Sequence, residues 1–177
     1  MLKRQIGRKP KALVDIQAQC EYGFPVVSKN YPLIIDDDDF EIFPTFFWLT
    51  CPVLVEQVDK IESRGVIASL ERELAEDAEL KESYIKAVNE YKKERIKALK
   101  EEDKIYLKNR GAFSALQKGI GGISDIEHLK CLHLHVAHEI ARSNPIGKLV
   151  FKRYGLSYCM SDKPYCFKKF GMEGKEH

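Results

Sequence analysis

The stretch Pro44-Thr45-Phe46-Phe47-Trp48-Leu49-Thr50-Cys51-Pro52 divides the chain into a part that favours strands and a part that favours helices. Its first six residues are rich in aromatic side chains, which is typical of a short strand. Thr50 or Cys51 then caps a helix, because Pro52 suits the first turn, where a backbone N–H has no helical partner. Strands come before this point and helices after it, and this order predicts an α+β fold.

Upstream of this junction, short apolar segments are separated by turn residues. Apolar and polar side chains alternate over residues 14–20, which predicts a half-buried strand with Cys20 on its inward face. Two more short strands are expected at residues 24–27 and 33–35, and the four aspartates at 36–39 are expected to form a turn or an exposed loop. The first fifty residues therefore predict a small, mostly antiparallel sheet.

One long charged helix dominates the predicted helical region. It is expected from residue 80 to about residue 107, after two shorter helices separated at Gly65. Its stripe of Tyr84, Val88 and Tyr91 should pack on its own domain. At 1.5 Å per residue the helix would reach about 40 Å, which is longer than one small core needs. The far end of the helix could therefore contact a second copy of the chain, in a homodimer, or another partner.

The bulk composition describes one ordinary globular domain. The chain has 177 residues, of which 44% are hydrophobic and 32% charged, and its net charge of +2 gives no strong nucleic-acid signal. No run of 18 apolar residues predicts a membrane span. Without an apolar leader, five cysteines predict reduced thiols or metal ligands in a cytoplasmic protein. We divide the chain into a basic arm (1–12), one α+β domain (13–157) and a cysteine-bearing tail (158–177).

A cluster of cysteine and histidine residues points to metal binding. The stretch Ser124-Asp125-Ile126-Glu127 resembles a capping box, which predicts a helix from residue 125 to about 142. On that helix Cys131 and His135 are four residues apart, so they share a face and can bind one ion. His133 would point roughly opposite, and it is kept with His138 as a reserve ligand.

A structural zinc site needs four ligands. The predicted set is Cys20, Cys51, Cys131 and His135, a Cys3His site that would join the sheet to the helices. An iron–sulfur cluster is the alternative, but it usually takes four thiolates, so Cys159 or Cys166 would then have to join. For zinc these last two thiols should not be needed, because their surroundings resemble a surface loop.

Other functions are compatible with the same residues. Cys51 at a helix N-terminus would have a stabilised thiolate, and with a nearby histidine either Cys51 or Cys131 could serve a cysteine-dependent enzyme. No third, orienting residue can be chosen from the sequence. A partner-binding protein that uses the long helix is a further alternative, and buried cysteines often do nothing but pack.

The chain resembles a bacterial family, domain-of-unknown-function family 501. The matching stretches span most of the chain from about residue 18 to residue 147. They are Cys20-Glu21-Tyr22-Gly23-Phe24-Pro25, Phe43-Pro44-Thr45-Phe46-Phe47-Trp48-Leu49-Thr50-Cys51-Pro52, Gly119-Ile120-Gly121-Gly122, Lys130-Cys131-Leu132-His133-Leu134-His135-Val136-Ala137-His138 and Asn144-Pro145-Ile146-Gly147. The resemblance implies a cytoplasmic single-domain protein, and it supplies no activity and no catalytic residues.

Overall fold

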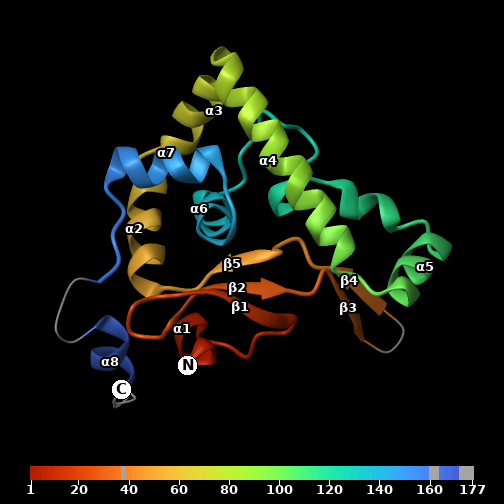
Figure 1. Ribbon diagram of the computed structural model, residues 1–177, viewed down its shortest axis with the longest axis horizontal. Helices are drawn as coiled ribbons and strands as arrows, with labels where there is room; N and C mark the ends of the chain where they lie inside the picture. The colour runs from red at the N-terminus through yellow and green to blue at the C-terminus, as the bar shows by residue number, and fades with distance from the viewer. Residues whose placement is uncertain (37–38, 160–163, 172–177) are drawn as a thin grey trace.

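A computed structural model describes residues 1–36, 39–159 and 164–171. It shows an α+β fold with the strands first and the helices after them, as predicted (Figure 1). The elements in chain order are α1 (Leu2–Ile6), β1 (Leu13–Gln19), β2 (Pro25–Asn30), β3 (Leu33–Asp36), β4 (Asp39–Ile42), β5 (Phe47–Leu49), α2 (Pro52–Glu62), α3 (Val66–Glu76), α4 (Ala78–Lys97), α5 (Glu101–Asn109), the 3₁₀ turns η1 (Phe113–Gln117) and η2 (Ile120–Gly122), α6 (Leu132–Ala141), α7 (Pro145–Tyr154) and α8 (Tyr165–Phe170).

The main sheet is antiparallel, in the order β1-β2-β5. In its register Val27 of β2 lies opposite Leu49 of β5, and both side chains are buried. Helix α6 lies against β5, and α2, α4 and α7 surround α6 (Figure 1). The main core therefore lies between the sheet and the helices, on one face of the sheet.

A smaller hairpin of β3 and β4 forms a second layer with its own core. Leu33 lies opposite Ile42 in this hairpin, and Leu33 packs with Leu99, Leu107 and Leu116. Two of the four aspartates predicted to form a turn, at positions 37 and 38, lie outside the described residues. The other two pair across the hairpin at Asp36 and Asp39.

The predicted long helix is shorter than expected. Tyr84, Val88 and Tyr91 are buried as predicted, but α4 ends at Lys97, and α5 begins at Glu101. The hydroxyl of Tyr31 accepts a hydrogen bond from the N–H of Lys100 at 2.9 Å, in place of a helical carbonyl. Burial of Leu99 and Leu107 in the second core favours this break, which no proline or glycine in the sequence indicates.

The predicted helix at 125–142 begins later than expected. Residues 123–131 form no helix, and Cys131 is the N-cap of α6 with an extended backbone (φ −158°, ψ 150°). Carboxylates from α2 and α3 accept hydrogen bonds from backbone N–H groups just before and at the start of α6. Oε1 of Glu71 accepts from the N–H of Leu129 at 2.9 Å, and Oε1 of Glu62 accepts from the N–H of Leu132. These tertiary hydrogen bonds replace the capping box.

Helices α6 and α7 cross at very close range. Asn144 caps α7, since its Oδ1 accepts from the N–H of Gly147 at 3.0 Å. A Cβ atom at Gly147 would lie 2.3 Å from the carbonyl oxygen of His135 and 2.6 Å from Cβ of Glu139. Only glycine permits this approach of the two backbones.

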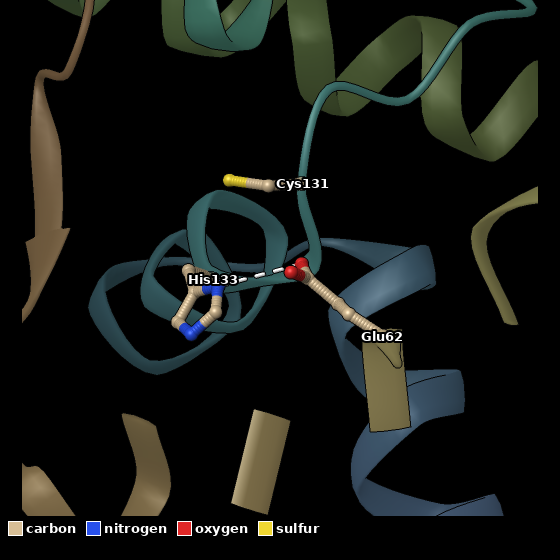
Figure 2. Close-up of side chains that lie close together, drawn as sticks. All are labelled: Glu62, Cys131 and His133. Carbon is tan, nitrogen blue, oxygen red and sulfur yellow. Dashed lines mark ion pairs between the residues drawn. The ribbon is translucent and has the colours of Figure 1, made fainter. Parts of the chain in front are cut away.

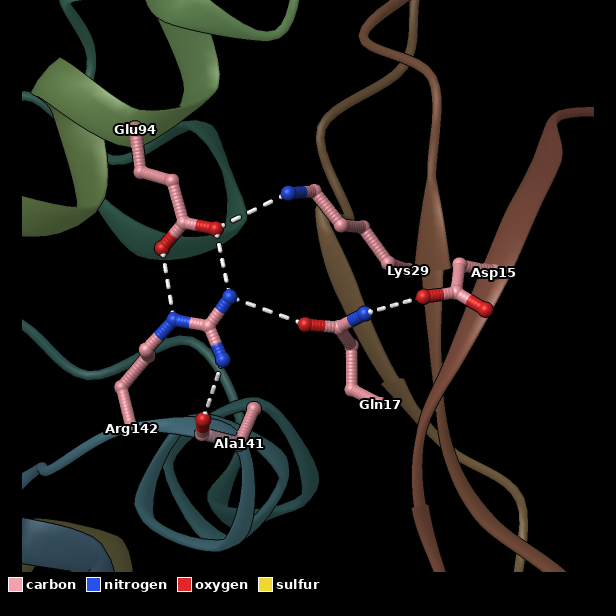
Figure 3. Close-up of polar contacts among 6 residues, drawn as sticks. All are labelled: Asp15, Gln17, Lys29, Glu94, Ala141 and Arg142. Carbon is pink, nitrogen blue, oxygen red and sulfur yellow. Dashed lines mark hydrogen bonds and ion pairs between the residues drawn. The ribbon is translucent and has the colours of Figure 1, made fainter.

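A polar network joins the sheet to the C-terminal end of α6 (Figure 3). The guanidinium of Arg142 binds both carboxylate oxygens of Glu94 in α4, at 2.8 and 2.7 Å. The same guanidinium donates to Oε1 of Gln17 in β1 at 2.8 Å, and Nζ of Lys29 in β2 lies 2.9 Å from Glu94. The sheet, α4 and the end of α6 are thus connected at one carboxylate.

The two ends of the described chain lie near each other, below the sheet in Figure 1. Arg4 of α1 donates to the carbonyl oxygen of Phe170 in α8 at 3.0 Å. Among the described helices, none is both long and apolar enough to cross a membrane.

Candidate functional site

Three side chains of metal-binding type converge between the end of α2 and the start of α6 (Figure 2). They are Glu62, Cys131 and His133, and one ligand atom from each lies within 4.8 Å of the others. Within the described ranges, no other set of three histidine, cysteine or acidic residues meets this spacing. All three residues are half-buried, so solvent reaches the site.

The packing of α2 against α6 positions this cluster. Asp59 and Glu62 are three residues apart on α2, and they present their carboxylates on one face. Oδ1 of Asp59 lies 3.2 Å from Nε2 of His133, and Oε1 of Glu62 lies 3.3 Å from Nδ1 of the same ring. The imidazole therefore bridges two carboxylates, and its orientation is fixed from both sides.

The thiol of Cys131 lies at the N-terminus of α6. Burial raises its pKa, the N–H groups of Leu134 and His133 lower it, and the neighbouring carboxylate of Glu62 raises it. The net shift is upward, so the free thiol is mostly protonated at neutral pH. A bound cation would reverse this balance, because a metal ligand must be the thiolate.

This donor set suits a borderline-soft divalent ion. Zinc is bound in proteins by cysteine sulfur, histidine nitrogen and carboxylate oxygen, and the cluster offers one of each. Three protein ligands leave a fourth tetrahedral position open to water or to another molecule. The Asp59 carboxylate behind His133 supplies the outer contact that orients metal-binding histidines in other proteins.

The structure does not place the sequence-predicted ligands around one point. Cys131 lies before α6, so the four-residue helical spacing to His135 does not apply. His135 is 1% exposed and packs in the core against Tyr84, with ring centroids 5.6 Å apart. Its reserve His138 is buried too, whereas the other reserve, His133, joins Cys131.

Cys51 lies at the opposite end of α2 from the cluster. It is the N-cap of this helix, whose eleven residues span about 16 Å, and Glu62 is the last of them. Cys20 follows β1 and packs against the same core as Cys51. The three cysteines of the predicted Cys3His set are therefore divided between the two ends of α2.

Sequence reasoning missed Glu62 and Asp59, and it kept His133 only as a reserve ligand. Glu62 and Asp59 are carboxylates on α2, where nothing in the sequence separates them from solvated residues. The signal that was available is the spacing Cys131-Leu132-His133, because residues two apart can converge when the first is an extended N-cap.

Two alternative functions were a cysteine-dependent enzyme and a partner-binding protein that uses the long helix, and the structure bears on each through different residues. Burial raises the pKa of Cys51 as well as that of Cys131, which is opposite to the shift that activates a nucleophilic thiol. The buried stripe of α4 packs on its own domain.

Comparisons with known proteins place the chain in a family. No curated protein and no solved structure matches it. A family described as a protein of unknown function, DUF501, matches residues 16–152, which is most of the chain. Glu62, Cys131 and His133 all lie inside the matched residues, whereas Cys159 and Cys166 lie outside them. The chain belongs to the DUF501 family.

Proposed function

We propose that this protein is a zinc-binding domain, and that Glu62, Cys131 and His133 hold the ion between α2 and α6. The observation that supports the proposal is the convergence of three different ligand types within 4.8 Å at a solvent-reachable position. The bound ion would link the end of α2 to the start of α6, the helix that lies against β5. This replaces the Cys3His set with one centred on Cys131.

The site has an alternative explanation that needs no metal. Glu62 already accepts the N–H of Leu132, and His133 already pairs with two carboxylates. These contacts alone would join α2 to α6. The test must therefore separate loss of a ligand from loss of a helix cap.

The substitution Glu62→Gln makes this separation, since the amide oxygen can still accept from Leu132 but is a poor zinc ligand. Zinc is titrated calorimetrically into full-length, chelator-treated, reduced protein. The Glu62→Gln and His133→Asn variants should each lose one equivalent of bound zinc. Their melting temperatures without metal should stay close to that of the unsubstituted protein.

The matched control is His128→Asn. His128 also lies near two carboxylates, with Glu71 at 3.5 Å and Asp125 at 3.6 Å, but none of the sets that meet the 4.8 Å spacing includes it. This variant should keep every equivalent of zinc. If Glu62→Gln bound as much zinc as the unsubstituted protein, the cluster would be only a helix cap with an ion pair.

A further inference from the structure

A second group of thiols lies around the N-terminus of α2, at the end opposite to Glu62. It comprises four of the five cysteines, Cys20, Cys51, Cys159 and Cys166. They come from four segments of the chain: the turn after β1, the N-cap of α2, the segment after α7 and helix α8. Figure 1 shows α8 and the segment that leaves α7 beside this end of α2.

Specific contacts hold these four segments together. The side chain of Gln57 in α2 binds both backbone groups of Ser157, at 2.8 and 3.1 Å, and so fastens the segment that carries Cys159. Gln5 donates to the carbonyl oxygen of Pro25 at 2.9 Å, and its Nε2 lies 3.6 Å from Sγ of Cys166. The thiols are therefore gathered by built contacts with α2 and β2.

Two of the four thiols border a cavity that opens to solvent. Cys20, Tyr158 and Cys159 line this cavity, whose volume is about 420 Å³. Cys20 and Cys159 are half-buried, while Cys51 is 7% exposed and Cys166 5% exposed. The group thus lies between the apolar core and an accessible space, where a cofactor can enter and still be shielded.

The four thiols also interact electrostatically. Burial raises the pKa of Cys51, and negative charge at Cys159 and Cys20 raises it further, against the effect of the first-turn N–H groups of α2. Burial likewise raises the pKa of Cys166, and the other three thiols add to that shift.

Their spacing is wider than the ligands of one ion require. In the described chain, the one set of three potential ligands within 4.8 Å of one another is Glu62, Cys131 and His133. No three of the four sulfurs around the N-terminus of α2 lie that close together. A tetrahedral zinc ion with bonds of 2.3 Å would need sulfurs about 3.8 Å apart. An iron–sulfur cluster places several iron and sulfide atoms between four cysteine ligands, so it accepts a wider arrangement.

We propose that Cys20, Cys51, Cys159 and Cys166 bind an iron–sulfur cluster, which fastens the C-terminal segment to the core. The family match ends at residue 152, so two ligands come from the family region and two from the segment that follows it. From the sequence, Cys159 and Cys166 were expected not to be needed for the zinc site. They are needed for the iron–sulfur cluster proposed here. The two proposed sites share no residue.

The fifth cysteine supplies a matched control. Full-length protein is purified without oxygen and incubated with ferric iron, a thiol reductant and sulfide, and its iron, inorganic sulfide and visible absorption are measured. We expect iron and inorganic sulfide in equal numbers, about two or about four of each per chain. Each of Cys20→Ser, Cys51→Ser, Cys159→Ser and Cys166→Ser should lose most of the iron and sulfide, whereas Cys131→Ser should retain both.

Cys159→Ser guards against misfolding as the cause of loss, because this residue is half-buried and lies outside the helices. Its circular dichroism spectrum should match that of the unsubstituted protein while the visible absorption is lost. Absence of iron and inorganic sulfide from the reconstituted protein, or a disulfide between these thiols, would overturn the proposal. So would equal iron in the Cys131→Ser and Cys159→Ser variants. None of these results bears on the zinc site at Glu62.

Discussion

The Nδ1 atom of His133 lies 3.3 Å from Oε1 of Glu62, and this pair joins the first turn of α6 to the last turn of α2. On the other side of the ring, Asp59 lies 3.2 Å from Nε2. If zinc binds at Nδ1, the Nε2–H must donate to Asp59, which fixes the tautomer and raises the basicity of the ligand.

The substitution Asp59→Asn should therefore weaken zinc binding without removing a ligand. We expect the dissociation constant to rise by roughly 10- to 100-fold, as for other outer contacts of metal ligands. Calorimetric titration measures the change, and Glu56→Gln, on an exposed part of the same helix, is the control. An unchanged dissociation constant in Asp59→Asn would place the zinc elsewhere.

Two buried histidines predict the response of the fold to mild acid. Asn144 uses Oδ1 to accept from Gly147, so its Nδ2 donates to Nδ1 of His135 at 3.4 Å and of His138 at 3.2 Å. Both imidazoles are then neutral and carry their proton on Nε2. Burial lowers the pKa of His135 to about 3 and that of His138 to about 4.

Unfolded histidines take up protons below about pH 6.5, whereas these two folded ones do not. The free energy of unfolding should therefore be highest above pH 6.5 and fall as the pH is lowered toward 4. The loss at pH 5 is on the order of 2 kcal/mol per histidine. Urea titrations at pH 7.5 and pH 5 test this, and His138→Gln should show about half the pH-dependent loss. Equal stability at both pH values would contradict the burial of neutral rings.

The close crossing of α6 and α7 predicts intolerance at Gly147. The substitution Gly147→Ala should lower the free energy of unfolding by about 1–3 kcal/mol, because its methyl group would overlap the backbone of His135. Urea denaturation measures this loss. Lys148→Ala is the control on the same helix, at an exposed position, and should change little. A neutral effect of Gly147→Ala would mean that the two helices lie farther apart.

The hydroxyl of Tyr31 contributes to the break between α4 and α5. Tyr31 donates to the carboxylate of Asp103 and accepts from the N–H of Lys100. The substitution Tyr31→Phe should cost about 1–2 kcal/mol of stability, and it should speed amide hydrogen exchange at Lys100. Tyr106→Phe, which keeps its ring contact with Phe40, is the control. Unchanged exchange at Lys100 would show that burial of Leu99 alone ends α4.

Local patterns in the sequence predicted much of the fold. The strand-to-helix change at Cys51-Pro52 and the buried stripe of α4 depend on spacing and caps that neighbouring residues supply, and both are present. The start of α6 was predicted wrongly, because Glu71 and Glu62 reach it from helices 58 and 70 residues earlier in the chain. The end of α4 was missed for the same reason, since Tyr31 is far away in sequence.

The candidate site likewise depends on contacts between residues that are far apart in the sequence. Cys131, one of the predicted ligands, lies in the cluster, but its neighbours there follow from the packing of α2 against α6. The group of Cys20, Cys51, Cys159 and Cys166 also depends on contacts between distant segments. Only the fold brings these residues together, because no pair of them forms a Cys-x-x-Cys motif.

The zinc site can be tested most directly by anomalous diffraction. Crystals of the full chain soaked in zinc would be measured above and below the zinc absorption edge. We predict an anomalous peak at bonding distance from Sγ of Cys131, Nδ1 of His133 and a carboxylate oxygen of Glu62, about 2.0–2.3 Å from each. The absence of a peak at these three atoms, with zinc bound elsewhere or not at all, would contradict the proposed function.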